Sequence, residues 1–329
     1  MNPSYPLTLF IVKQCYDYDG HIQISSGLRT SAQFVVDMLL AQGYRAKLVL
    51  AVDGNSIDAL VAQNKPANVV IEALWVTPTK LAELHKLHPK VRWTVRIHSE
   101  TPFLAQEGCA VAWLAAYFKQ GIQVAFNSKN TMEDFQVIAR TIYLPNYYPL
   151  RTPRNAGPIG TRLDVGCFGA IRPLKNQLIQ ACAAVRFAQL RDKQLIFHMN
   201  GTRVEQFGSN NLKNIAALLA AAGQTLELHP WMDHNDFLEL LATMDICLQI
   251  SLTESFNIVS ADAVSMGVPL VGSAAIPWLP RRSIAKVDSS ESIVTAMRLA
   301  GPVTVAANHD ALDAYTSEAV TLWTDWIGS

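Results

Sequence analysis

The sequence predicts an α/β protein built from two doubly wound, Rossmann-like domains. Short apolar segments rich in β-branched residues alternate with amphipathic helical segments along the chain, a pattern typical of parallel sheets covered by helices. The chain has 329 residues, half of them apolar, which is too much apolar sequence for one small core. The stretch Pro149–Gly160 is rich in Pro, Gly and Arg, the composition of an interdomain linker.

These observations predict the domain organisation. We expect a first domain at residues 1–150, a linker at residues 151–160 and a second domain at residues 161–305. Residues 306–329 should form a C-terminal helix. Its apolar side chains include two tryptophans, so it should dock on a domain rather than fray.

The first domain is expected to open with a strand, a helix and a second strand: Leu7–Val12, Ala32–Leu40 and Lys47–Val52. Small residues, Ser25–Gly27, form the turn between the first strand and the helix. A glycine such as Gly27 lets a ligand approach the backbone closely, although a tight turn without a ligand explains it equally well. The G-x-G-x-x-G fingerprint of dinucleotide-binding proteins is absent.

Two further strands are expected at Asn68–Leu74 and Arg92–Ile97, and His98 follows the second one directly. Ligands of parallel sheets bind beyond the carboxyl ends of the strands. We therefore treat His98 as a candidate site residue, the alternative being a packed or surface histidine.

The segment between these strands, Lys80–Arg96, is rich in Lys, Arg and His. Such a cluster could hold an anionic acceptor or touch a membrane surface. His85 and His88 are spaced for one helix face, but a solvated face explains them better than a metal site does.

The second domain should begin with a strand at Asp164–Gly169. A loop carrying Arg172 and Lys175 then enters a helix through Leu178–Val185. Two cations beside the free N–H groups of a helix start suit a diphosphate. Taken alone, the same pair could equally be the solvated start of a helix.

Histidines and acids also gather in His229–Asp236. A metal site is conceivable there. An Asp N-cap ahead of the following helix explains Asp233 or Asp236 more simply, so we expect no metal ligands.

The most informative part of the second domain is a strand–loop–helix–strand unit. The strand is expected at Ile246–Ile250, the polar loop at Ser251–Ser255, the helix at Phe256–Met266 and the next strand at Val268–Val271. Such units place their loops at the ligand-binding edge of a parallel sheet.

Two acids and a helix start lie in this unit. Glu254 is in the loop, and Asp262 is expected about two turns into the helix. The backbone N–H groups at the helix start, a natural seat for a phosphate, belong to Ser255, Phe256, Asn257 and Ile258. The arrangement suits a nucleotide-sugar, although both acids could be ordinary surface residues.

The string ESFNIVSAD, which starts at Glu254 and is followed by GVP, resembles the E-x7-E motif of retaining GT-B glycosyltransferases of the family four (group 1) type. Asp262 stands where that family usually has its second Glu. The string FGAIRPLKN, residues 168–176, resembles the family's FG-x-IRP-x-KG motif, with Asn176 in place of Gly.

The resemblance implies two Rossmann-like domains facing across a cleft, the GT-B arrangement. It also implies that Arg172 and Lys175 neutralise the leaving diphosphate, that Glu254 contacts the transferred sugar and that Asp262 holds the ribose. Asp is one methylene shorter than Glu, so here a shorter side chain would make the ribose contact. No covalent nucleophile and no metal are implied.

In the first domain the resemblance is one of layout more than of motif. It implies that His98 contacts the transferred sugar and that Gly27 lies near the donor phosphates and the acceptor. The last strands of the first domain are expected at Val124–Lys129 and Tyr143–Leu150. Residues 127–128 and 145–146 resemble the family's Ser and Pro-Asn turns. In that family the last helix often crosses back to the first domain.

We therefore expect a glycosyltransferase of carbohydrate biosynthesis that moves a sugar from a nucleotide diphosphate donor, with retention of configuration. UDP or GDP is the expected nucleotide, and the acceptor is a glycan, a lipid-linked or a small molecule. The expected catalytic residues are His98, Arg172, Lys175 and Glu254. The alternatives are a GT-B-fold epimerase or phosphorylase, or a non-catalytic sugar-nucleotide-binding scaffold.

Composition excludes several other classes. The net charge is zero, so nothing indicates a nucleic-acid partner. The five cysteines are scattered without C-x-x-C spacing, which favours buried thiols in a reducing compartment. The sequence shows no secretory signal and no apolar run of membrane-spanning length, so we expect a soluble, cytoplasmic protein. Oligomeric state is open.

Overall fold

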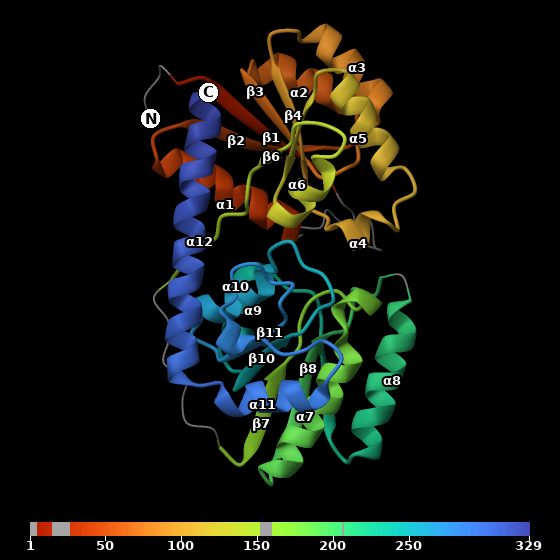
Figure 1. Cartoon of the computed structure of the whole chain (residues 1–329), viewed down its shortest axis with the longest axis vertical. Coiled ribbons are helices and arrows are strands. Elements are labelled where there is room, and N and C mark those ends of the chain that lie inside the picture. The colour runs from red at the N-terminus through yellow and green to blue at the C-terminus, as the bar shows by residue number, and fades with distance from the viewer. Residues whose placement is uncertain (1–4, 15–26, 152–159, 206) are drawn as a thin grey trace. The chain divides into compact units, whose positions relative to one another are not determined.

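The computed structural model describes residues 5–14, 27–151, 160–205 and 207–329. Most of the expected linker, the two serines of the expected Ser25–Gly27 turn and Cys15 fall outside these ranges. The chain divides into two compact units (Figure 1). Unit 1 comprises residues 1–149 and 316–329, and unit 2 comprises residues 150–315.

Unit 1 contains one parallel sheet with the strand order β2-β1-β3-β4-β5-β6. Its strands are β1 Leu7–Lys13, β2 Arg45–Ala51, β3 Asn68–Glu72, β4 Arg92–Ile97, β5 Gln123–Phe126 and β6 Ile142–Tyr143. Its helices are α1 Gly27–Ala41, α2 Ser56–Asn64, α3 Pro78–Leu87, α4 Thr101–Leu104, α5 Ala110–Lys119 and α6 Lys129–Phe135. The order reverses at β1, which makes the sheet doubly wound.

Both faces of this sheet are buried because successive residues of a strand point to opposite sides. In β1, Leu9 and Ile11 join a core with residues of α2, α3 and α5, whereas Phe10 joins a second core with residues of α1. In β5, Val124 belongs to the first core and Ala125 to the second. The continuous apolar runs in the sequence therefore reflect strands covered on both faces.

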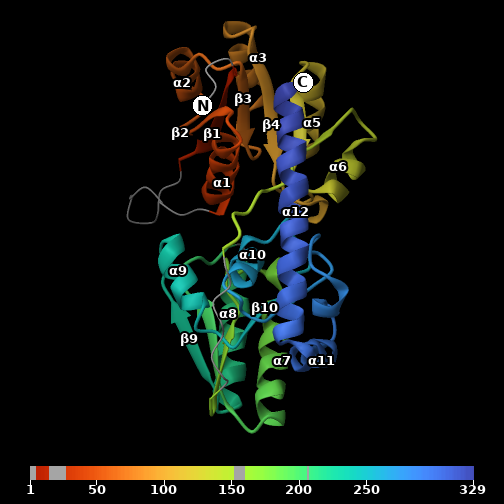
Figure 2. The same ribbon diagram turned by 90° about the vertical axis from the view of Figure 1, so that its left-hand side faces the viewer.

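The final helix, α12 Pro302–Gly328, is one continuous element (Figure 2). Its last part belongs to unit 1, where the Trp323 side chain is fully buried. The indole N–H of Trp323 donates to the carbonyl oxygen of Pro145 at 2.8 Å, and its ring lies 5.5 Å from that of Phe10. Docking of the apolar helix end thus completes the second core of unit 1.

Unit 2 contains a second parallel sheet, ordered β11-β10-β7-β8-β9. Its strands are β7 Arg162–Gly166, β8 Gln194–Asn200, β9 Thr225–His229, β10 Ile246–Gln249 and β11 Leu270–Gly272. Its helices are α7 Gln177–Leu190, α8 Gly208–Ala221, α9 His234–Leu241, α10 Ile258–Ser265 and α11 Ser290–Leu299, with short 3₁₀ turns at Pro173–Lys175 and Arg281–Ser283.

The main core of unit 2 lies on one face of this sheet. Leu163 and Val165 of β7 and Phe197 of β8 pack there with residues of α7, α8 and α11. The alternating residues, including Asp164 and His198, belong to the opposite face. This second face carries polar groups.

One expected strand is much shorter than predicted. The sequence suggested strand structure at Tyr143–Leu150, but β6 ends at Tyr143. Pro145 follows and has no N–H to donate to a ladder, so the pairing stops. Among the described residues, no helix is both long enough and apolar enough to cross a membrane.

Candidate active-site residues

The loop after β7 is tied to the loop after β8. The backbone N–H of Gly169 donates to Oδ1 of Asn200 at 2.7 Å, and the N–H of Ile171 donates to the carbonyl of Arg203 at 2.9 Å. Gly169 has φ +113°, a conformation that disfavours any residue with a Cβ. These two hydrogen bonds therefore fix the backbone of the FGAIRP segment at the end of the sheet.

Asn176 explains how this chain departs from the glycine of the FG-x-IRP-x-KG motif. Its φ is +55°, in the left-handed region where glycine and asparagine are the tolerated residues. Its side-chain amide donates to the carbonyls of Ile250 at 3.2 Å and Val287 at 2.8 Å. The substitution therefore keeps the backbone turn and adds two cross-links within unit 2.

Lys175 and Glu254 form a direct ion pair. Nζ of Lys175 lies 2.6 Å from Oε1 of Glu254, and the two side chains are only 12% and 8% exposed. The residues are 79 positions apart and come from the two loops that the sequence motifs marked. A lysine ammonium has three donors, so this contact leaves it able to donate to an anionic ligand as well.

Arg172 pairs with a different acid, which the sequence analysis missed. Its Nη1 lies 3.4 Å from Oε2 of Glu205, whose other oxygen accepts from Nε of Arg203 at 2.6 Å. The backbone N–H of Glu205 also donates to the carbonyl of Ile171. Glu205 is thus held beside Arg172 by main-chain pairing that no local sequence pattern indicates.

The start of α10 is fixed by Asn257, which has φ +63°. Its side-chain oxygen accepts from the N–H of Ser260 at 2.9 Å, and its amide donates to Gln249 at 3.0 Å. Gln249 in turn donates to the carbonyl of Phe168 at 2.9 Å. The helix start is therefore locked to β10 and to the FGAIRP loop, next to the predicted phosphate seat.

Asp262 lies one turn into α10, because the helix starts at Ile258. The prediction that it lies about two turns into the helix is therefore wrong. Its side chain is 2% exposed, and Oδ1 lies 2.7 Å from Nε2 of His234. His234 is the first residue of α9, where Asp233 accepts from the N–H groups of residues 235 and 236. The expected Asp N-cap is therefore confirmed at Asp233. His234 is a partner of Asp262 that the sequence did not reveal.

In unit 1, His98 belongs to a buried ionic network at the end of β4. Glu72 and Arg96 are both 0% exposed, and Nη1 of Arg96 lies 3.0 Å from Oε2 of Glu72. Glu72 also bonds Nε2 of His98, and Nδ1 of His98 lies 3.3 Å from the amide of Asn127. Arg96 further donates to Asn146 at 2.5 Å.

This network sets the charge states of its members. Burial by itself raises the pKa of Glu72, but Arg96 and His98 lower it below the ordinary 4.5, so the carboxylate stays ionised. Burial, with the nearby Arg96, lowers the pKa of His98 below its ordinary 6.5. A neutral imidazole that donates from Nε2 to Glu72 leaves Nδ1 as the acceptor for Asn127.

The basic residues of Lys80–Arg96 do not form one solvated surface. Arg96 is buried, and the Arg92 guanidinium lies 4.3 Å from the centre of the Trp326 ring. His88 is partly exposed and lies 2.7 Å from Asp58. These partners leave mainly lysines for any contact with an anion or a membrane.

Gly27 is the first residue of α1, and the serines before it lie outside the described residues.

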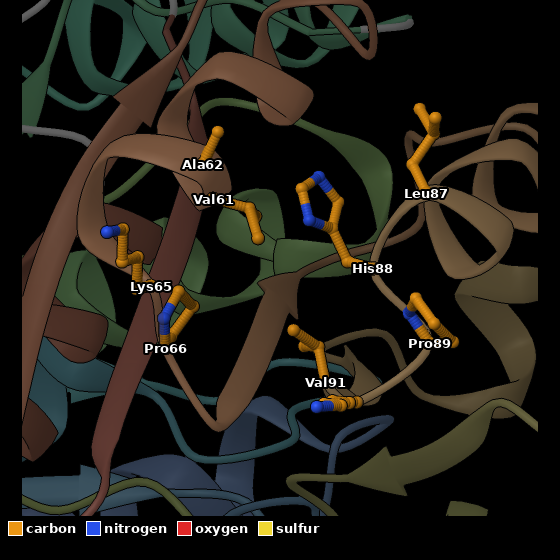
Figure 3. A pocket seen from close by; sticks show the side chains of 9 residues that line it. Val61, Ala62, Lys65, Pro66, Leu87, His88, Pro89 and Val91 are labelled. Carbon is orange, nitrogen blue, oxygen red and sulfur yellow. The ribbon is translucent and has the colours of Figure 1, made fainter.

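A pocket of about 320 Å³ in unit 1 is lined by Val61, Ala62, Lys65, Pro66, Leu87, His88, Pro89, Lys90 and Val91 (Figure 3). Pro66 and Val91 precede β3 and β4, so this pocket lies at the amino ends of the strands. His98 follows the carboxyl end of β4, at the other edge of the sheet.

In a comparison with protein families, residues 162–299 match the model described as "Glycosyl transferases group 1". This segment contains both motifs and the Lys175–Glu254 pair. A search of curated protein sequences found no significant relative.

Solved structures resemble the chain over nearly its whole length. The N-terminal domain of Candida albicans trehalose-6-phosphate phosphatase has a TM-score of 0.70 at 9% identity, covering 99% of this chain and 97% of that one. Sucrose-phosphate synthase from Thermosynechococcus elongatus has 0.70 at 12%, covering 98% of each. Anabaena HepE in complex with UDP and glucose has 0.63 at 15%, covering 96% of each. At these identities the likeness establishes the fold.

Proposed function

We propose that this chain, whose residues 162–299 match the group 1 glycosyltransferase model and whose fold is GT-B, transfers a sugar from a nucleoside diphosphate-sugar with retention of configuration. UDP or GDP is the proposed nucleotide. HepE was solved with UDP and glucose, and with UDP-glucose, which supports a UDP-sugar as the first donor to test. The acceptor is proposed only by class, as a glycan, a lipid-linked sugar or a small molecule.

The observation that carries this proposal is the Lys175–Glu254 pair at 2.6 Å, beside the capped start of α10. A diphosphate needs a cation and free N–H donors at one place, and a developing oxocarbenium-like centre needs an anion nearby. The pair supplies a cation and an anion from adjoining loops of one unit. The two charges neutralise each other in this structure, which stabilises them before a ligand arrives.

In the proposed reaction the diphosphate lies at the start of α10 and accepts from Lys175, with Arg172 as a second cation. Charge that develops on the leaving phosphate is then balanced by fixed groups, which need little reorganisation during the step. Glu254 accepts hydrogen bonds from the transferred sugar, and Asp262 accepts from the ribose. His98 is proposed to contact the sugar from unit 1.

Binding of UDP and GDP to Lys175→Ala, measured by calorimetry, tests this proposal. Loss of a charge-assisted contact costs on the order of 1.5–3 kcal/mol, so affinity should fall at least about tenfold. Lys213→Ala, an exposed lysine on α8, is the matched control and should bind normally. Unchanged affinity in Lys175→Ala would refute the site, whereas intact binding without any transfer would favour a non-catalytic scaffold.

A further inference from the structure

We propose that unit 2 binds a divalent transition-metal ion, with zinc the best fit, through His198, Glu227 and His229. This site is separate from the proposed donor site and does not depend on it. The sequence analysis looked for metal ligands within residues 229–236 and expected none. The structure instead directs Asp233 and His234 of that segment to other partners and brings His229 to a histidine of the neighbouring strand.

Strand pairing places the three ligands on one face of the sheet. His198 of β8 is paired in register with Glu227 of β9, and His229 lies two residues farther along β9, on the same side. This is the face opposite the core formed with α7, α8 and α11. Two hydrogen-bonded strands therefore hold the three ligands, and no loop is needed to position them.

The ligand atoms already approach the spacing of a metal site. Nδ1 of His198 lies 2.9 Å from Nε2 of His229, and Glu227 oxygens lie 3.8 Å from each of these nitrogens. One such atom per residue can be chosen so that all three lie within 4.8 Å of one another. Zinc bonds of about 2.0–2.1 Å in a tetrahedron separate ligand atoms by roughly 3.3–3.4 Å. On binding an ion, the two histidine nitrogens would move apart and a Glu227 oxygen would move closer to both of them.

Asp164 orients the first ligand. Its Oδ1 accepts from Nε2 of His198 at 2.9 Å, so the tautomer leaves the Nδ1 lone pair directed at His229 and Glu227. The other oxygen of Asp164 accepts from Arg162 at 2.7 Å. A carboxylate behind a ligating histidine is the usual support of a zinc site, because it fixes the ring and raises the basicity of the nitrogen.

Hydrogen bonding alone explains this cluster less well. A single bond between His198 and His229 accounts for their 2.9 Å separation, but Glu227 lies beyond hydrogen-bond distance of both nitrogens. An ion bound among the three atoms would also give Glu227 a partner, which no hydrogen bond to these two nitrogens does.

Two imidazoles and one carboxylate favour zinc or a similar nitrogen-binding ion over Ca²⁺ or Mg²⁺, which prefer oxygen ligands. The metal would join β8 to β9, the edge strand of the sheet. His229 ends β9, and the segment after it leads to His234 at Asp262. We therefore infer a structural ion that steadies the edge strand and the segment that follows.

The test is calorimetric titration of ZnCl₂ into the EDTA-treated, dialysed full-length chain, with Co²⁺ absorption as a second readout. The expected result is one ion per chain, a higher thermal midpoint with zinc, and the visible absorption of tetrahedral Co²⁺. Glu227→Gln and His229→Ala should each weaken zinc binding at least tenfold. His309→Ala, outside the cluster, should bind zinc like the parent chain.

Glu227 is half exposed, so Glu227→Gln should fold even if His229→Ala does not. Circular dichroism of both variants checks this point. Binding only at millimolar zinc, or equal zinc affinity in the parent chain and Glu227→Gln, would overturn the site. Because the readout is metal binding, loss of nucleotide binding or of sugar transfer would leave this conclusion unaffected.

Discussion

The carboxylate of Asp262 lies 2.7 Å from Nε2 of His234, across the two helices α10 and α9. Asp262 stands where the resembled motif has a longer Glu, and it is almost completely buried. A histidine from the neighbouring helix start thus fixes the shorter acid in one orientation. This contact connects the E-x7-E-like helix to the segment after β9.

We expect Asp262→Asn to weaken binding of both the free nucleotide and the nucleotide-sugar, because the ribose is common to them. Loss of a charge-assisted contact predicts a reduction of roughly tenfold or more in calorimetric affinity. His234→Ala should give a smaller loss, since it leaves the acid in place but frees its orientation. Equal affinity in all three proteins would contradict the ribose assignment.

Glu254→Gln should lower sugar-transfer turnover while nucleotide affinity stays within a few-fold of the parent enzyme. The amide keeps the shape but removes the negative charge beside the reacting sugar, which predicts a loss on the order of 100-fold. Initial rates and nucleotide affinity should be measured on the same preparation. Glu291→Gln, on the exposed surface of α11, is the control and should turn over normally. Unchanged turnover in Glu254→Gln would favour an epimerase, phosphorylase or scaffold.

Much of the fold was predictable from the sequence because it depends on local patterns. Apolar runs such as Ile246–Ile250 identify buried strands, and the loops that carry Lys175 and Glu254 are marked by their motifs. Strand order brings these loops together, and parallel sheets constrain that order strongly.

The acids and histidines around the motifs were not predictable. His234 is 28 residues from Asp262, and Glu72 is 26 residues from His98. Each pair depends on which strands and helices are neighbours, and neither His234 nor Glu72 is part of a recognisable motif. Asp262 was expected two turns into the helix instead of one because the helix starts at Ile258 and not at Phe256. Helix boundaries are the weakest part of a sequence-based prediction.

The Glu72–Arg96–His98 network should make the stability of unit 1 depend on pH. The folded-state pKa of Glu72 is lowered, so its stabilisation is present above its ordinary value of 4.5 and is lost as pH falls through the folded pKa. His98 also has a lowered pKa, so the unfolded chain binds its proton first and stability starts to fall below about pH 6.5. Both shifts act in the same direction, toward acid instability.

Urea unfolding of the parent chain and Glu72→Gln from pH 4 to 8 tests this dependence. At pH 7.5 the variant should be less stable by about 3–5 kcal/mol, because Arg96 would lose its buried partner. Its stability should fall less on acidification than that of the parent chain. Glu83→Gln, an exposed acid on α3, should behave like the parent. Parallel pH curves for the parent and Glu72→Gln would contradict the assignment.

Replacing Asn176 by Gly should destabilise the protein less than replacing it by Ala. Asn176→Gly keeps the left-handed φ of +55° at no steric cost and loses two hydrogen bonds, to Ile250 and Val287. Asn176→Ala loses the same bonds and adds about 1–2 kcal/mol of backbone strain. Differential scanning calorimetry should therefore give midpoints in the order parent, Gly, Ala, with exposed Asn210→Ala close to the parent. Because Lys175 directly precedes this residue, Asn176→Ala should also weaken UDP binding more than Asn176→Gly does. Equal midpoints for the Gly and Ala variants would show that the left-handed turn relaxes, and that Asn176 acts through its side chain alone.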